Sequence, residues 1–453
     1  IMKIFATFCI ILSFFQHSFA VVQLELNDLK SFPALFGDYA DAITHARSNP
    51  SICFITSTSV GSTGKEIPAS GNQPRRWEGS WKYCLGLKEP RFILPKTSGI
   101  INYTGGSSHT TSDTGNFYYA GQTAPAPGLE FHGQSIYFAR VKNFVLRFLT
   151  LRLGTQGTRE EDTLMINEGG DYALDHNSFT WGRDEVLTLS QGNPGKNPSG
   201  SKKIIIQRNL IAEAIDGHNT GSLCGYTGYY NDRDLYTDPI EAEWHMNLYA
   251  NVNHRTPNVA TGKNGFVKVA NHVISNTVTR TTNALADSVL DYVNNYVRPG
   301  NRNKDPVRGG QTTVWQGALR NGPWVPSLYS KGTVIHGFKT SDQDDRPYWR
   351  HFEERSKQVD TKHFRSSPLP STKFSYKPVS GEEAYKSLVE DEEVGNNRCT
   401  SADGRPVSCV SPIDKEFMKD IRDGTTPSNG NGFNAATWRS KVPAERVNSG
   451  YAD

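Results

Sequence analysis

Charged residues recur at similar intervals in the middle of the chain. Three of them each follow an asparagine by seven to nine residues. The pairs are Asn177 with Asp184, Asn209 with His218, and Asn247 with Arg255. Asp162 precedes Asp184 by 22 residues, and Glu185 is its direct neighbour. If each asparagine marks the same corner of successive turns of a coil, these side chains line one face at about 4.8 Å per turn.

A row of carboxylates that ends in an arginine suits one kind of chemistry. Carboxylate oxygens are the ligands that calcium prefers, and the carboxylates of a substrate can complete its shell. In a polyuronate, the proton at C5 lies next to a carboxylate, so its removal builds negative charge there. Calcium and Arg255 can neutralise that charge while the glycosidic oxygen at C4 leaves by β-elimination. The row therefore predicts calcium-assisted cleavage of an acidic polysaccharide.

The elements that must position this row follow a repeated pattern from about residue 129 to residue 300. Each repeat has an apolar strand, an asparagine and a second apolar strand. The asparagines are Asn177, Asn209, Asn247, Asn271 and Asn294, which lie 32, 38, 24 and 23 residues apart. Each turn of a solenoid contacts only its neighbours, so insertions of variable length can leave the coil outward. Asparagine suits the corner because it tolerates left-handed backbone, and stacked amides can bond from coil to coil.

The segments between these strands contain no amphipathic stretch that could form a helix of about 10 to 15 residues. A doubly wound sheet needs such helices to connect its parallel strands. The pattern therefore predicts an all-β protein built as a parallel β-helix.

Six motifs appear in one order between about residues 115 and 300. They are Gly121-Gln122-Thr123-Ala124-Pro125, Val145 to Gly154, Leu174 to Glu185, Gly221-Ser222-Leu223, Asn247-Leu248-Tyr249 and Arg255-Thr256-Pro257. Together they resemble the pectate lyases, especially a branch with an Asp-His, Ser-x-Ser/Thr-Trp and Asp-Glu signature. The resemblance implies a right-handed, single-stranded parallel β-helix. It also implies a polysaccharide lyase that acts on pectate or a related polyuronate.

The resemblance assigns roles to individual residues. Arg255 matches the arginine of an Arg-x-Pro motif, which is the proposed base that abstracts the C5 proton. The high intrinsic pKa of this arginine would fall beside calcium and in a site that substrate covers. Asp162 and Asp184 match calcium-binding positions, with Glu185 as a further ligand. We expect substrate contacts from His218, His254 and Lys263.

The chain departs from the family pattern at three positions. Thr188 stands where a second acidic residue is common, Ala260 where a second arginine is common, and Thr220 near the place of a lysine. His218 or Lys263 could replace the missing basic contacts. The losses leave open an alternative function, that of a non-catalytic extracellular β-helix that binds polysaccharide or is structural.

A β-helix glycoside hydrolase is a third hypothesis. In it, Asp162, Asp184 and Glu185 would supply the acid and base of hydrolysis. The chain lacks the Asn-Thr-Asp and Gly-His-Gly elements of the polygalacturonases, which weighs against this hypothesis.

The amino-terminal residues have the pattern of a secretory signal. Lys3 supplies a positive charge, residues 4–15 are apolar, and small residues precede a cleavage site near Ala20. The apolar run is short for a membrane span. We therefore expect a secreted, extracellular protein with no membrane contact after signal removal.

The cysteines fit an oxidising compartment. Cys9 leaves with the signal, so five cysteines remain. The expected bridges are Cys399 with Cys409 and Cys53 with Cys84, which leaves Cys224 without a bridge. Asn102-Tyr103-Thr104 is an acceptor sequence for N-glycosylation, so a glycoprotein is expected.

We divide the chain into a signal peptide at 1–20, an amino-terminal extension and cap at 21–110, a β-helix catalytic domain at 111–340, and a loop-rich carboxyl-terminal extension at 341–453. Charged residues make up 21% of the chain, and the mean hydropathy of −0.55 fits a soluble body. The formal net charge of +3 is too small to suggest a nucleic-acid partner. We expect a monomer whose partner is an acidic, polygalacturonate-like polysaccharide.

Overall fold

The computed structural model describes residues 52–424 with interior gaps. The described residues are 52–71, 75–103, 109–154, 161–192, 197, 199–215, 218–225, 238–277, 280–299, 314–316, 325–351, 356–371 and 376–424. The predicted signal peptide lies outside them. No helix in this described part is long and apolar enough to cross a membrane.

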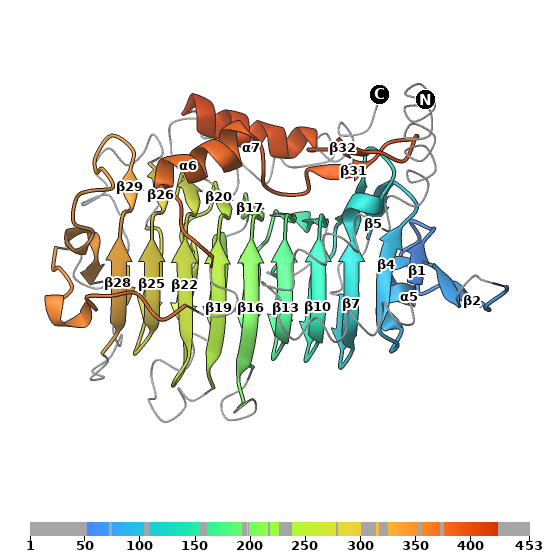
Figure 1. Cartoon of the computed structure of the whole chain (residues 1–453), viewed down its shortest axis with the longest axis horizontal. Coiled ribbons are helices and arrows are strands. Elements are labelled where there is room, and N and C mark those ends of the chain that lie inside the picture. Colours follow the sequence, from blue (N-terminus) through green and yellow to red (C-terminus); the bar gives the residue numbers. More distant parts are fainter. Residues whose placement is uncertain are drawn as a thin grey trace, which may run out of the picture.

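Most of the described strands form three sheets that wind together into one coil (Figure 1). The first sheet has twelve strands, and the second and third have nine each. Strands in adjacent coils pair in parallel, and β2 with β3 is an antiparallel exception at the amino-terminal end. This arrangement confirms the predicted all-β parallel β-helix.

The first sheet contains, in spatial order, β2 (Gly64–Ile67), β3 (Arg76–Gly79), β1 (Ile52–Ile55), β4 (Arg91–Pro95), β7 (Gly115–Ala120), β10 (Lys142–Arg147), β13 (Gly170–Asp175), β16 (Ser201–Gln207), β19 (Ile240–His245), β22 (Phe266–Ala270), β25 (Val289–Val293) and β28 (Ser327–Lys331). The second contains β29 (Val334–Ile335), β26 (Tyr296–Arg298), β23 (Val273–Ser275), β20 (Leu248–Ala250), β17 (Leu210–Ala212), β14 (Ser178–Thr180), β11 (Thr150–Arg152), β8 (Leu129–His132) and β5 (Gly99–Asn102). The third contains β30 (Arg350–His351), β27 (Val314–Gln316), β24 (Asn283–Leu285), β21 (Asn258–Ala260), β18 (Thr220–Gly225), β15 (Glu185–Ser190), β12 (Leu164–Asn167), β9 (Ile136–Ala139) and β6 (His109–Ser112).

All three sheets contribute apolar side chains to the interior of the coil, and those of the first sheet form columns. The strand register puts one buried side chain over the next in successive coils. One column contains Leu146, Leu174, Ile206, Trp244, Val269 and Tyr292. A second column stacks Phe117, Phe144 and Tyr172, whose ring centroids lie 5.3 and 4.8 Å apart. Burial of each such side chain contributes about 1.5–3 kcal/mol, so these columns favour one register between coils.

Two neighbouring positions form the corner between the first and second sheets. The first position is left-handed, with φ between 51° and 56° at His176, Arg208, Met246, Asn271 and Asn294. The second position carries Asn177, Asn209, Asn247, His272 and Asn295, which we call the ladder.

The first three asparagines of the ladder pair their buried amides with groups of neighbouring coils. The Asn177 amide donates to Asn209 Oδ1 at 2.9 Å, and the Asn209 amide donates to Asn247 Oδ1 at 3.0 Å. The same two amides also donate to main-chain carbonyls of the preceding coil. Because these buried polar groups are paired, the ladder joins neighbouring coils without an uncompensated cost of burial.

The predicted asparagine repeat is confirmed at Asn177, Asn209 and Asn247 and is wrong by one residue in the next two coils. Asn271 and Asn294 occupy the left-handed position, while the residues that follow them continue the ladder. Asparagine suits both positions, because its amide can stack and its backbone tolerates positive φ. Residue type alone therefore does not separate the two positions.

The amino-terminal end of the coil is closed by helix α5 (Trp81–Gly86). Trp81 packs edge-on against Tyr119 at a centroid distance of 5.1 Å. The predicted disulfide between Cys53 and Cys84 is confirmed and ties this helix to β1. The buried Arg91 donates to carbonyls near the end of α5, groups that a helix end leaves without a partner.

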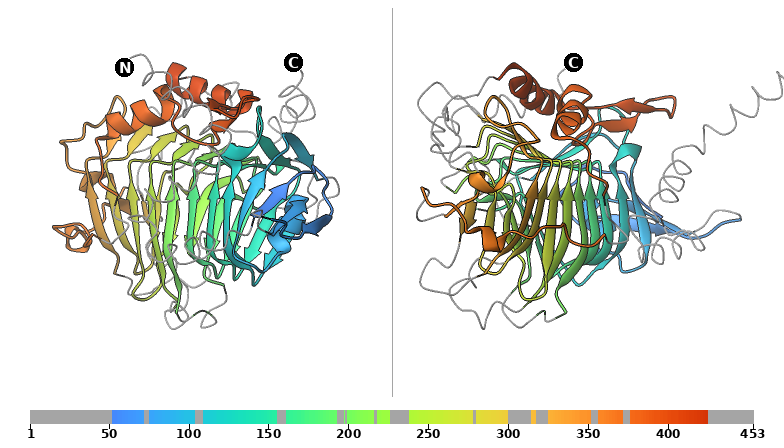
Figure 2. Two further views of the ribbon diagram at one scale, coloured as in Figure 1. Left: turned by 45° about the vertical axis from the view of Figure 1, so that its right-hand side comes forward. Right: turned by 60° about the vertical axis from the view of Figure 1, so that its left-hand side comes forward.

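The carboxyl-terminal segment, described at residues 356–371 and 376–424, runs back along the coils from the last towards the first. Its hydrogen bonds join Arg365 to Asp291, Val379 to Asn271, Glu393 to Arg208, Asn396 to Thr150, and Thr400 to Ala124. Helix α6 (Gly381–Tyr385), the π-helical turn η7 (Lys386–Glu390) and helix α7 (Pro412–Asp423) lie along one side of the coil (Figures 1 and 2). The hairpin of β31 (Arg398–Thr400) and β32 (Pro406–Ser408) carries the predicted Cys399–Cys409 disulfide, which is confirmed. Cys224 is buried and unbridged, as expected.

Helix α7 was not predicted from the sequence, and the prediction of a loop-rich extension is wrong for residues 412–423. The Ser411 side chain caps its first turn, and the left-handed Gly424 ends it. One face packs into the core between the helix and the second sheet through Ile413, Phe417, Met418 and Ile421. On the same helix, the buried Asp414 forms an ion pair of 2.9 Å with Arg152 of β11. Apolar and ionic contacts therefore both attach α7 to the coil.

Asp175, at the end of β13, is fully buried beside the ladder. It accepts hydrogen bonds from Arg147 at 2.6 Å and Gln207 at 3.0 Å, and it contacts His176 Nδ1 at 2.7 Å. Burial by itself would raise the pKa of Asp175, but His176 and Arg147 outweigh it and hold the pKa well below its usual range. The carboxylate is therefore the centre of a structural ionic group.

Replacing Asn209 by leucine should lower the free energy of unfolding by about 2–3 kcal/mol, because buried partners in two coils lose their hydrogen bonds. Urea-induced unfolding followed by circular dichroism measures the change. The exposed Gln358 provides the control, since Gln358→Leu should change stability by less than about 0.5 kcal/mol. Equal effects of the two substitutions would contradict a stabilising role of the ladder.

The stability that Asp175 provides should depend on pH. Its folded-state pKa is lowered, so the contribution is present above the ordinary carboxyl pKa of 3.8 and is lost as the pH falls below it. At pH 7, Asp175→Asn should cost about 3–5 kcal/mol, because it leaves Arg147 buried without its partner. The difference in unfolding free energy between this variant and the wild type should be smaller at pH 3 than at pH 7. Urea unfolding midpoints at both pH values measure it. A difference that stays constant would show that the charge of Asp175 is not what stabilises the corner.

Candidate active site

The candidate site lies where the chain enters the third sheet in successive coils. Asp184 directly precedes β15, and Glu185 is the first residue of that strand. Asp162 precedes β12, His218 precedes β18, and Arg255 precedes β21. Because these strands are parallel and adjacent, their amino ends meet at one edge of the sheet. The structure therefore brings together five residues that the sequence analysis placed on one face.

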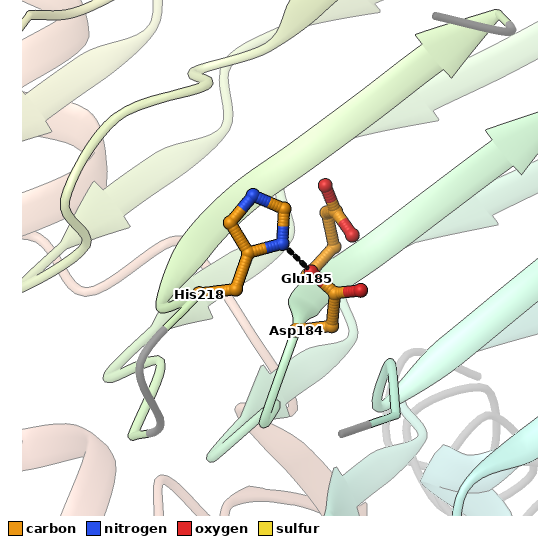
Figure 3. A group of neighbouring side chains, drawn as sticks. All are labelled: Asp184, Glu185 and His218. Carbon is orange, nitrogen blue, oxygen red and sulfur yellow. Dashed lines mark hydrogen bonds and ion pairs between the residues drawn. The ribbon is translucent and has the colours of Figure 1, made fainter. Parts of the chain in front are cut away.

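The side chains of this group are joined by direct contacts. Figure 3 shows Asp184, Glu185 and His218 together, and their possible ligand atoms lie within 4.8 Å of one another. His218 Nδ1 is hydrogen-bonded to Asp184, and His218 Nε2 lies 3.0 Å from Arg255 Nη2. Arg255 Nη1 forms an ion pair with Glu185. The main-chain N–H of Glu185 donates to Asp162 Oδ1 at 2.9 Å, which adds the fifth residue to the group.

The contacts of His218 determine which ring nitrogen carries a proton. A guanidinium group only donates hydrogen bonds, so His218 Nε2 accepts from Arg255. A ring with its proton on Nδ1 then donates to the Asp184 carboxylate. His218 therefore links the arginine to the acidic row.

The main chain holds Arg255 in a conformation that few non-glycine residues adopt. Its φ is 68°, in the left-handed region. Arg255 N donates to Thr281 O at 3.0 Å, and Arg255 O accepts from Ser222 N at 2.6 Å. A Cβ at Gly221 would lie 2.5 Å from Arg255 O, so only glycine leaves room for that carbonyl. The coils on both sides therefore fix the backbone of Arg255.

The charges in the site alter one another's proton affinity. Burial raises the pKa of Asp162 to about 7, the Thr188 hydroxyl opposes this shift, and the Asp184 carboxylate adds to it. Burial also lowers the pKa of Arg255, against the attraction of Asp184 and Asp162. The site therefore makes both a charged aspartate and a charged arginine less stable than they are in water.

The donor atoms of the group fit a divalent cation. Asp184 and Glu185 offer carboxylate oxygens, which calcium prefers, whereas Asp162 is not among the residues whose ligand atoms lie within 4.8 Å of one another. His218 adds an imidazole nitrogen, a ligand that transition metals also accept. A cation bound here would favour the charged form of Asp162, whose pKa burial and the Asp184 carboxylate raise.

The other two predicted substrate contacts lie in different surroundings. The His254 side chain is buried, and its carbonyl accepts from Gly221 N at 2.8 Å. Lys263 is exposed and follows the carboxyl end of β21, whereas Arg255 precedes the amino end of the same strand. The strand thus separates Lys263 from the group around Arg255.

Two positioning residues were not recognised from the sequence. Gly221 belongs to the Gly221-Ser222-Leu223 motif, but its role is to leave room for the Arg255 carbonyl, and this depends on the pairing between coils. Thr281 contributes only a main-chain carbonyl, so its side-chain type gives no signal.

No model of a known protein family matches the chain. Two curated relatives are each named probable pectate lyase C. The protein of Emericella nidulans is 27% identical over 180 residues, and that of Aspergillus terreus is 30% identical over 180 residues. Each match covers 40% of this chain and 40% of the relative.

Over these 180 residues the chain is similar to curated pectate lyases.

The comparison with solved structures also found pectate lyases. One is pectate lyase Bsp165PelA from Bacillus sp. N165 in complex with trigalacturonate, at 16% identity and a TM-score of 0.43, covering 68% of this chain and 86% of the other. Another is pectate lyase C from Erwinia chrysanthemi with Ca2+, at 14% identity and a TM-score of 0.46, covering 69% and 84%. The chain spans about 40% of the length of the two curated relatives.

Replacing Gly221 by alanine should destabilise the protein by about 1–3 kcal/mol, because the new methyl group would press on the Arg255 carbonyl. Thermal unfolding measures the effect. Gly86→Ala is the matched control, since a Cβ at Gly86 meets no atom within 4 Å. If both variants unfold at the wild-type temperature, Gly221 does not restrict the position of Arg255.

Proposed function

We propose that the protein is a polysaccharide lyase that cleaves pectate or a related polyuronate by β-elimination. The observation that carries the proposal is the direct contact of the Arg255 guanidinium with an acidic group drawn from adjacent coils. The similarity to curated pectate lyases supports the same reaction class. A row of polar residues that crosses successive coils would suit a long, repetitive substrate.

In the proposed reaction, Arg255 acts as the base. In its neutral form a nitrogen of the side chain takes the proton from C5 of a uronate unit. The C5–H electron pair forms the C4–C5 double bond, the C4–O bond breaks, and the leaving oxygen takes a proton. Partial burial of Arg255 favours the neutral form that this role requires. Ser222 and Thr281 keep the arginine backbone in place while its side chain reacts.

Asp162 and Asp184 would hold a calcium ion, with Glu185 as a further ligand. When bound, calcium neutralises the charge that builds on the substrate carboxylate. His218 orients Arg255 through Nε2 and can contact the sugar from its exposed side. His254 and Lys263 remain predictions as substrate contacts.

We also propose that the protein acts outside the cell as a monomer. The leader pattern of residues 1–20 and the two disulfides support an oxidising, extracellular location. The exposed Asn102 side chain is the proposed site of N-glycosylation.

A non-catalytic polysaccharide-binding protein is the second candidate. Three substitutions favour it, because Thr188, Thr220 and Ala260 replace an acidic residue and two basic residues that pectate lyases often have. Such a protein would bind polyuronate at the same group without turning it over.

The full chain should release unsaturated products from polygalacturonate, seen as a rise in ultraviolet absorbance. A chelator should abolish the rise, and added calcium should restore it. New reducing ends without the absorbance would indicate a hydrolase. Binding with no turnover on any polyuronate would support the second candidate.

Arg255→Ala should lower the rate about a hundredfold or more, because a positioned acid or base contributes about 10²–10⁴-fold to such reactions. Polyuronate binding should persist. The control is Arg140→Ala, since this exposed arginine pairs with Asp113 and precedes β10, away from the site.

A further inference from the structure

We propose that Glu185 is shared between two cations, pairing with Arg255 when the metal site is empty and with the metal ion when it is filled. Metal binding and release of the Arg255 guanidinium would then be linked. This inference rests on the cation site of the proposed function, but it does not require lyase activity.

Because Glu185 is buried, its carboxylate needs a partner that compensates its charge. Glu185 is the first residue of β15, and its side chain is only 5% exposed. A buried carboxylate is costly unless a cation or hydrogen-bond donors compensate it. In this structure Arg255 Nη1 supplies that compensation.

The same carboxylate also belongs to the possible metal-ligand group. The donor atoms of Asp184, Glu185 and His218 lie within 4.8 Å of one another, so one ion could contact all three. A divalent ion at this place would lie close to the Arg255 guanidinium. Two cations this close in a partly buried site repel strongly, so Glu185 cannot serve both equally well.

Both side chains that hold the guanidinium are members of this group. Glu185 contacts Arg255 Nη1, and His218 Nε2 contacts Arg255 Nη2. If either side chain turns to a metal ion, its bond to the arginine weakens. Binding of the ion would therefore loosen both attachments of the side chain at once.

The backbone of Arg255 would stay in place during this exchange. Its N–H and carbonyl are bonded to Thr281 and Ser222, which are not part of the ligand group. Only the side chain would be released, next to the position where the proposed substrate carboxylate binds. An arginine held by Glu185 in the absence of metal would thus be freed where it is needed.

Thermodynamic linkage is reciprocal. If a bound metal ion weakens the ion pair of Arg255 with Glu185, that ion pair must weaken the affinity for the metal ion by the same factor. Isothermal titration of the full chain with calcium chloride measures this in four proteins: the wild type, Arg255→Met, Glu185→Gln and the double variant. Arg255→Met should tighten calcium binding about tenfold in the wild-type background. In the Glu185→Gln background, the same change should tighten it less than about threefold.

Equal gains in both backgrounds would overturn the proposal, because general charge repulsion would then explain the effect. No gain from Arg255→Met would overturn it as well. Arg140→Met should leave calcium affinity unchanged and controls for the loss of one positive charge elsewhere. Thermal unfolding of each variant checks that it is folded.

The titration contains no substrate, so its outcome is independent of the proposed reaction. Coupling without turnover on polyuronates would retain the linkage and reject the lyase. Turnover without coupling would retain the lyase and reject the sharing of Glu185.

Discussion

The fixed register of parallel pairing between coils is the constraint on which this structure depends. Each strand of the first sheet places its apolar residues over those of the coil before it, as in the column from Leu146 to Tyr292. The ladder continues the same register through the corner, where Asn177, Asn209 and Asn247 are bonded in succession. A slip by one residue would turn the apolar side chains outward and separate the amides.

The candidate site is a product of that register. Asp184, His218 and Arg255 lie far apart in the sequence and meet only because three coils are aligned at the amino ends of β15, β18 and β21. Charges gathered in this way in a partly buried place need partners, and the structure pairs them with one another. Burial raises the pKa of Asp162, so a further cation nearby would favour its charged form.

Much of this arrangement could be predicted from the sequence, because a solenoid repeats its register as a visible pattern. The asparagines gave a reference point, and counting from them brought Asp184, His218 and Arg255 together. The same residue type misled the prediction at Asn271 and Asn294, which use the left-handed tolerance of asparagine and not its amide ladder. Gly221 leaves room for the Arg255 carbonyl, and Thr281 accepts a main-chain hydrogen bond from Arg255. Neither role depends on side-chain chemistry, so the residue types did not predict them. Helix α7 was missed because one short amphipathic stretch stands alone in a polar tail.

The course of the carboxyl-terminal segment changes how such an array can lose its structure. In a simple solenoid each repeat touches only its neighbours, so the ends can fray while the middle stays intact. Here one continuous stretch of chain is bonded to early, central and late coils, through partners that include Thr150, Arg208 and Asp291. This stretch therefore connects early, central and late coils to one another, and we expect the array to unfold as one cooperative unit and not as a row of separate repeats.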